Sequence, residues 1–386
     1  MLTFFKKRIL VLMNNMLERK IENKKIVWFK NSNSYLVLEP IVAEIILKLK
    51  MEISLKEIEI WSFDKINAPK QAITEFVKDI YLLYKENNKL EKENESETKN
   101  YKTPNNYYSQ RLYEINNLVF NIQTENAYLE RLIHPVFAHL ETKSKKKIHY
   151  SYQVFEEKNS IVFLKNNVLI GKWNKKEAHV FQGKISMHIL IDCYKKPEKN
   201  WMGVFHASAV SNNKEAMLFL GDSGNGKSTS LAILNANGFN CIADDFVPID
   251  DKKTIRTYPA AISIKKKSIE ALLPFYPKLK NTEEHHLKKL NKIVRYLPPK
   301  NIDYDIKLKC KALVFIKYDS EVELDIKSIS KIDAFQQLIP DSWISPIQKN
   351  ASTFLDWFLE LPCYQLTYFN NSKMIKTVSK IFNDDL

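Results

Sequence analysis

The octapeptide GDSGNGKS, residues 221–228, contains three of the seven glycines in this chain of 386 residues. It matches the pattern G-x-x-x-x-G-K-[ST], in which glycines let backbone N–H groups turn toward phosphate oxygens. In such a loop the lysine reaches the β and γ phosphates of ATP, and the hydroxyl after it binds Mg²⁺. We therefore expect a nucleotide-binding set that consists of Gly221, Asp222, Ser223, Gly224, Asn225, Gly226, Lys227, Ser228 and Thr229.

The flanking sequence supplies the strand and the helix that such a loop requires. Residues 216–220 form a short apolar run typical of a strand, and residues 229–237 predict a helix that ends at Gly238. Bound phosphates would then lie at the helix N-terminus, where unpaired amides and the helix dipole favour anions. The alternative is a chance glycine-rich turn, which this strand and helix disfavour.

Two adjacent carboxylates, Asp244 and Asp245, follow a second apolar run at residues 239–243. We expect this run to pair in parallel with the first strand through a right-handed crossover, so that both strands end at one edge of the sheet. Ligands bind at that edge in sheets of this kind. One aspartate would hold Mg²⁺, and the other would accept a proton from an incoming hydroxyl. A structural role for one of them, capping a turn before Pro248, stays open.

A histidine precedes the loop. His206 lies in a strand-like segment at residues 203–210, and from its spacing alone a buried structural histidine is an equal alternative. The combination of this histidine, GDSGNGKS and an Ala-Asp-Asp triplet at residues 243–245 resembles the HPr kinase/phosphorylase family, which has the phosphoenolpyruvate carboxykinase-like nucleotide-binding fold. The motifs that carry the resemblance lie within residues 203–250.

The resemblance implies a fold and a set of roles. The fold would be α/β (α+β), a mixed-sheet domain that contains the phosphate loop. Lys227 would bind phosphate, Ser228 and Asp244 would hold Mg²⁺, Asp245 would be the base, and His206 would support the reacting groups. By analogy with such kinases, the resemblance also implies a homo-oligomer.

The chain departs from that family after the aspartates. The family carries a glycine-rich signature with an E-I-R-G-L-G core, whereas this region reads YPAAISIKKKSIEALLP and no glycine follows Gly238. HPr is therefore disfavoured as the target, and so is phosphorolysis. Glu270 lies about where the family has a carboxylate near the metal, and we take it as a third candidate metal ligand, with a solvated helical residue as the alternative. Arg295 is a candidate cation for the transferring phosphoryl group.

Residues 20–88 predict a separate small domain. Strands at residues 25–30 and 35–38 form a hairpin, and helices follow from Pro40, from residue 55 and at residues 69–85. With the run SYLVLEPIVAEIILKL, this arrangement resembles the PqqD-type winged-helix modules that bind leader peptides of modified ribosomal peptides. The resemblance implies a peptide partner added as an edge strand beside the hairpin. A small helical domain with a regulatory or dimerising role is the alternative.

A charged linker at residues 89–106 leads to a predicted kinase domain at residues 107–386. Its first part predicts strands at residues 112–123, 149–156, 161–164 and 168–173 and a helix at residues 126–140, which we expect to form the first half of the kinase sheet. Its last part predicts a strand at residues 312–318 and a helix at residues 332–338. The final helix, strand and helix, at residues 352–361, 364–369 and 373–382, are expected to close that domain.

Composition limits the class of protein. The net charge is +14, but no nucleic-acid-binding motif accompanies it. The four cysteines are far apart and form no C-x-x-C pair, which indicates reduced thiols and a cytoplasmic protein. The N-terminal apolar run is too short for a signal peptide or a membrane span. His285 and His286 are expected on a solvated helix without a metal.

Together these features predict an ATP- and Mg²⁺-dependent kinase. The γ-phosphoryl group would pass to a serine or threonine hydroxyl, on a ribosomally made peptide or a small protein that the N-terminal module delivers. Two alternatives stay open: a kinase of a small-molecule hydroxyl with the same nucleotide site, and a non-catalytic ATP-gated peptide carrier or sensor.

Overall fold

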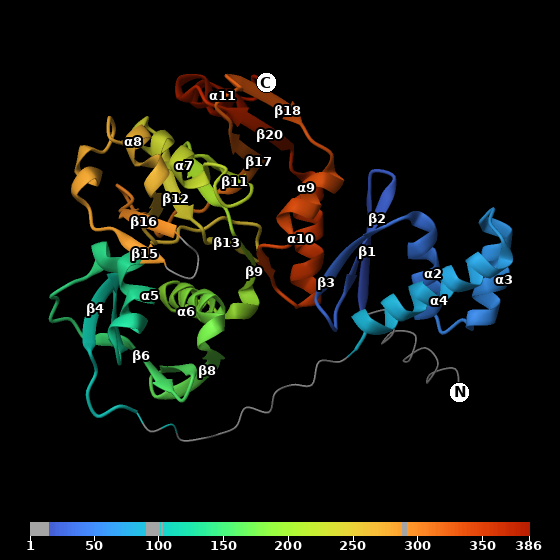
Figure 1. Cartoon of the computed structure of the whole chain (residues 1–386), viewed down its shortest axis with the longest axis horizontal. Coiled ribbons are helices and arrows are strands. Elements are labelled where there is room, and N and C mark those ends of the chain that lie inside the picture. The colour runs from blue at the N-terminus through green and yellow to red at the C-terminus, as the bar shows by residue number, and fades with distance from the viewer. Residues whose placement is uncertain (1–14, 90–100, 102, 288–291) are drawn as a thin grey trace. The chain divides into compact units, whose positions relative to one another are not determined.

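A computed structural model of the chain describes residues 15–89, 101, 103–287 and 292–386 (Figure 1). The fold is mixed α/β with several sheets. The chain divides into two compact units, and the first contains both the N-terminal region and Ile329–Glu360. The second unit ends with Leu361–Leu386. The predicted N-terminal apolar run and most of the predicted linker lie outside the described residues.

The first unit begins with a three-stranded antiparallel sheet. Its strands are β1 (Met16–Ile21), β2 (Lys24–Phe29) and β3 (Ser34–Leu38), paired in that order. The predicted hairpin is confirmed as β2 and β3, and β1 adds a strand that starts before the predicted boundary at residue 20. Val27 and Phe29 face one side of this sheet, and Trp28 faces the other, because side chains alternate along a strand.

Three helices cover one face of this sheet, as the sequence predicts. They are α2 (Pro40–Lys50), α3 (Leu55–Lys65) and α4 (Lys70–Asn87). Pro40 occupies the first turn of α2, where its missing N–H costs nothing. Ser54 and Glu57 form a reciprocal capping box at the start of α3. Val27 and Phe29 share a buried cluster with apolar residues of all three helices.

The other face of the sheet is covered by residues from much later in the chain. These residues form α9 (Lys331–Leu338), β19 (Ser342–Ile344) and α10 (Gln348–Glu360). The ring of Tyr35 on β3 contacts Phe335 of α9 and Phe354 of α10 edge-on, at centroid distances of 6.2 and 5.5 Å. Arg19 of β1 donates to the Asp356 carboxylate at 2.7 Å. The predicted 107–386 domain thus includes a segment that folds with the first unit.

The second unit contains a five-stranded sheet in its N-terminal part. Its strands, in sheet order, are β4 (Ser109–Ile115), β5 (Leu118–Thr124), β6 (Ile148–Glu157), β7 (Ser160–Lys165) and β8 (Val168–Asn174). The associated helices are α5 (Ala127–Phe137) and α6 (Ala178–Cys193). The expectation that these strands form half of the kinase sheet is wrong, because they form a sheet of their own. The predicted strand at 112–123 is a hairpin, with Asn116 and Asn117 both in the left-handed region at its turn.

A six-stranded mixed sheet carries the glycine-rich loop at residues 221–226. Its order is β12 (Asn240–Asp244), β10 (Ser208–Ser211), β11 (Glu215–Leu220), β17 (Lys309–Tyr318), β20 (Cys363–Tyr368) and β18 (Leu324–Ser328). The prediction that β11 pairs with β12 is wrong, because β10 lies between them and is antiparallel to both. The two strands nevertheless run in the same direction, so both end at the same edge of the sheet, as required for a shared site.

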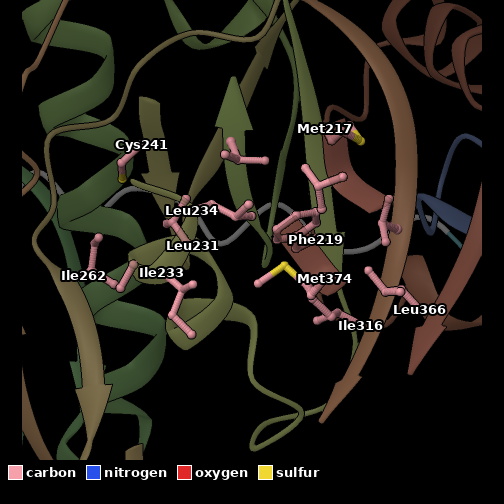
Figure 2. Packing of buried hydrophobic residues seen from close by; sticks show 14 of the residues in the cluster. Met217, Phe219, Leu231, Ile233, Leu234, Cys241, Ile262, Ile316, Leu366 and Met374 are labelled. Carbon is pink, nitrogen blue, oxygen red and sulfur yellow. The ribbon is translucent and has the colours of Figure 1, made fainter. Parts of the chain in front are cut away.

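Helix α7 (Lys227–Ala236) follows the loop and packs near β10 and β12. Figure 2 shows its Leu231 and Leu234 in the same buried cluster as Phe219 of β11 and Met374 of α11 (Asn371–Asn383). All four side chains are fully buried. The shared core joins α7 to β11 and α11, and the loop connects the end of β11 to the start of α7.

Smaller pieces complete the second unit. Strand β9 (Trp201–Phe205) pairs with β13 (Val247–Asp250), and β16 (Lys292–Leu297) lies between β14 (Ile262–Lys265) and β15 (His285–Leu287). The remaining helical turns are α8 (Ile269–Leu272), η1 (Ala138–Leu140), η2 (Lys175–Glu177), η3 (Glu198–Asn200), η4 (Lys266–Ser268) and η5 (Pro277–Asn281). The helix expected at His285 and His286 is wrong, because both residues are in β15.

In the described residues no helix is both long and apolar enough to cross a membrane. All four cysteines, Cys193, Cys241, Cys310 and Cys363, are free thiols.

Candidate nucleotide-binding site

The loop between β11 and α7 depends on glycine. Gly221, Gly224 and Gly226 have φ of 126°, 112° and 95°, in the region that side chains disfavour. A Cβ atom on Gly221 would also lie 2.9 Å from the backbone oxygen of Ile316 on β17. The loop can therefore pass this close to the neighbouring strand only with glycine at its start.

Lys227 is held inside the loop. Its side chain is only 6% exposed, and Nζ donates to the carbonyl oxygen of Gly221 at 2.6 Å and to that of Asp222 at 3.4 Å. An ammonium group is not buried without polar partners, and here the loop carbonyls supply them. The positive charge is thus positioned at the start of α7, where an anion would also meet the helix N-terminal amides.

Ser228 and Asp244 contact each other at the edge of the sheet. The Ser228 hydroxyl donates to Asp244 Oδ1 at 3.1 Å, and the Ser208 hydroxyl of β10 donates to the same oxygen at 2.5 Å. The backbone N–H of Ser263 on β14 donates to Asp244 Oδ2 at 3.1 Å. Three donors therefore fix a carboxylate that is only 2% exposed.

Burial changes the ionisation of Asp244. Loss of hydration raises its pKa from the ordinary 3.8 to about 7, the charge of Asp245 adds to this rise, and the hydrogen bonds from Ser208, Ser263 and Ser228 oppose it. A carboxyl group in this state is ready to exchange its proton for a cation, because a bound metal ion would supply the missing positive charge.

Asp245 has a different environment, although it is the next residue. It adopts φ of 59°, a left-handed conformation that is uncommon for residues other than glycine. Its carboxylate is 48% exposed, and Oδ1 lies 3.9 Å from Nδ1 of His206, which is itself 40% exposed. The turn directs one aspartate inward and the other to solvent, so the two carboxylates are suited to different tasks.

His206 is outside the strand in which the sequence placed it. It lies between β9 and β10, in the two-residue break at residues 206–207. This break turns the chain just before Ser208, so that the histidine reaches Asp245 and the serine reaches Asp244. The alternative of a buried structural histidine is wrong, since the ring is 40% exposed.

Two further residues that the sequence suggested, Glu270 and Arg295, make no described contact with Ser228 or Asp244. Glu270 is exposed on α8, and in the described part of the chain it has no hydrogen bond or ion pair with Ser228 or Asp244. The guanidinium of Arg295 donates to the carbonyls of Leu279 and Lys280 and to the Glu284 carboxylate. Arg295 therefore joins segments of the second unit to one another.

The sequence did not indicate several residues that contact the loop or Asp244. Ser208 and Ser263 both hold Asp244, and neither belongs to the recognised motif. The Lys265 Nζ lies 2.9 Å from the Ser223 hydroxyl in the loop, and the backbone N–H of Tyr318 donates to the Asn225 carbonyl at 3.0 Å. In the sequence, Lys265 is one of three consecutive lysines at 265–267, and this run alone does not show which of them contacts the loop.

Ser228 and Asp244 are the candidate protein ligands for a metal ion at this site. Across residues 15–89, 101, 103–287 and 292–386, no group of three or more His, Cys, Asp or Glu side chains is placed to hold one. Magnesium bound with a nucleotide needs fewer protein ligands, because phosphate oxygens and water complete its six positions. The adjacent Ser228 hydroxyl and Asp244 carboxylate fit that smaller requirement, and both are oxygen donors of the kind Mg²⁺ prefers.

The raised pKa of Asp244 has a measurable consequence in the metal-free protein. Between pH 3.8 and about 7 the folded protein keeps a proton on Asp244 that the unfolded chain has released. The contribution of this group to the free energy of unfolding therefore falls as the pH rises through that interval. Because asparagine does not titrate, the difference in unfolding free energy between wild type and Asp244→Asn isolates the carboxyl group.

We expect wild type to lose stability relative to Asp244→Asn as the pH rises over this interval, measured by urea denaturation in EDTA. A difference between the two proteins that stays constant with pH would contradict the raised pKa.

The chain matches no protein-family model, and a search of curated proteins finds no similar sequence.

Proposed function

We propose that the protein is an ATP- and Mg²⁺-dependent kinase of the HPr kinase-like group. The observation that carries the proposal is the different environment of two adjacent carboxylates, with Asp244 buried and Asp245 exposed. The buried carboxylate contacts the Ser228 hydroxyl next to the phosphate loop, and the exposed one lies beside His206 at the same sheet edge. A metal ligand next to a solvent-accessible base is the arrangement that phosphoryl transfer to a hydroxyl needs.

Each residue of the site has a separate role in the proposed reaction. The loop amides and Lys227 bind and orient the phosphates of ATP, which supplies the phosphoryl group. Ser228 and Asp244 would hold a Mg²⁺ ion, whose charge would offset that of the phosphates. Asp245 takes the proton from the acceptor hydroxyl. The hydroxyl oxygen forms a bond to the γ-phosphorus, and the bond between the γ-phosphorus and the bridging oxygen of ADP breaks. His206, whose Nδ1 lies 3.9 Å from Asp245 Oδ1, supports the reacting groups. Catalysis then rests on positioning and charge neutralisation.

The acceptor that we propose is a serine or threonine of a ribosomally made peptide or small protein. The support is the first unit, whose β2–β3 hairpin and helices α2, α3 and α4 are the elements expected of a PqqD-like module. A kinase of a small-molecule hydroxyl would use the same nucleotide site, and so would an ATP-gated carrier that does not transfer phosphate.

Nucleotide binding is the first requirement of the proposal, and Lys227→Met tests it. Removing a charge-assisted hydrogen bond to phosphate costs about 1.5–3 kcal/mol, so we expect Mg-ATP affinity to fall about 10- to 100-fold in isothermal titration calorimetry. The matched control is Lys267→Met, which removes the same charge from an exposed residue in η4. Equal affinity of wild type and Lys227→Met for Mg-ATP would contradict the assignment of the loop.

A further inference from the structure

Strand β14 passes along the candidate site and presents two residues to it. The backbone N–H of Ser263 contacts the Asp244 carboxylate, and two residues later the Lys265 Nζ contacts the Ser223 hydroxyl. Ile262, before Ser263, and Ile264, between Ser263 and Lys265, are fully buried in the apolar core of the second unit. Because side chains alternate along a strand, Ser263 and Lys265 share the face opposite that core.

Lys265 therefore adds a second ammonium group to the loop. Lys227 donates to the loop carbonyls of Gly221 and Asp222 from within, whereas Lys265 reaches the loop at Ser223 from the neighbouring strand. Because β14 contacts both the candidate metal-binding carboxylate and the loop, its lysine would be within reach of the γ-phosphate of a nucleotide that bound there with Mg²⁺.

We propose that Lys265 is the residue that distinguishes a nucleoside triphosphate from a diphosphate at this site. The inference rests on the proposed nucleotide-binding function and deepens it. The Lys265 ammonium turns from the Ser223 hydroxyl to an oxygen of the γ-phosphate, a charge-assisted contact that a diphosphate cannot offer because it has no γ-phosphate. After transfer this contact is lost from the product nucleotide, so that ADP binds less tightly than ATP.

The experiment compares Mg-ATP and Mg-ADP affinities by isothermal titration calorimetry for wild type, Lys265→Gln, Lys265→Arg and Lys267→Gln. Lys267 is the matched control, because it is exposed and only two residues away. A lost charged hydrogen bond predicts that Lys265→Gln weakens Mg-ATP about tenfold or more and Mg-ADP less than about threefold. Lys265→Arg keeps the charge and should keep most of the preference for ATP, and Lys267→Gln should change neither affinity.

The outcomes separate the two claims. If wild type binds Mg-ATP and Lys265→Gln weakens both nucleotides equally, or neither, the role of Lys265 is overturned and the nucleotide site stands. If wild type binds neither nucleotide, the proposed function is overturned and the role of Lys265 with it. Thermal unfolding of each variant confirms that the compared proteins are folded.

Discussion

Asp245→Asn is expected to lower phosphoryl transfer by about 100-fold or more, with Mg-ATP affinity changed by less than about threefold, because a general base contributes about 10²- to 10⁴-fold to a rate. Asparagine has nearly the same shape as aspartate and is well tolerated in the left-handed region that residue 245 occupies, at φ of 59°. The substitution therefore removes the basic group and keeps the turn.

Asp384→Asn is a matched control for this substitution. Asp384 also has a left-handed backbone, with φ of 60°, and its side chain is 78% exposed in an ion pair with Lys311 at the end of α11. The same chemical change in the same conformation should leave transfer unchanged there. Turnover of Asp245→Asn within a few-fold of wild type would remove Asp245 from the base role.

Deletion of residues 1–88 alone is expected to be far more damaging than removal of the whole first unit. The segment Ile329–Glu360 folds with the N-terminal residues, and its Phe335 and Phe354 are almost fully buried against neighbours that include Tyr35. A fragment that begins at residue 89 keeps both phenylalanines and loses Tyr35. Exposing such a side chain costs about 1.5–3 kcal/mol, and the exposed face promotes aggregation.

The matched fragment begins at the same residue and also replaces Ile329–Glu360 with a short glycine-rich turn. This change is feasible because β18 and β20, on either side of the segment, are antiparallel neighbours with Ser328 opposite Tyr364. We expect more soluble monomer from this fragment than from the simple truncation, measured by size-exclusion chromatography. The reverse order would show that the segment does not depend on the N-terminal residues.

This architecture also changes how the acceptor should be tested. Loss of activity on deleting residues 1–88 would follow from damage to the segment at 329–360 as well as from loss of peptide delivery. Point variants on the first unit that leave Tyr35 and Arg19 intact are therefore the better test of a peptide-binding role.

The local elements of the site were predictable from the sequence because each depends on short-range signals. The glycines, the strand before them and the helix after them locate the loop, and the Asp-Asp pair follows the next strand of the same direction. Pro40 and the capping box at Ser54 likewise predict helix starts in the first unit.

The arrangement of those elements was less predictable, because it depends on contacts distant in sequence. Strand β10 lies between β11 and β12, although nothing in the crossover itself requires a third strand there. The division of roles between Asp244 and Asp245 depends on the left-handed turn at residue 245 and on hydroxyl and amide donors from β10, α7 and β14. The segment at 329–360 shows no local sign of folding with residues 15–89.

The most direct test of the kinase assignment follows labelled γ-phosphate from Mg-ATP to candidate acceptors. The purified protein is offered the small peptides encoded beside its gene, with Asp245→Asn in parallel. We expect label on a serine or threonine hydroxyl with wild type and none with Asp245→Asn. Tight binding of Mg-ATP without transfer to any peptide would contradict it, and would favour a kinase of small molecules or an ATP-gated carrier.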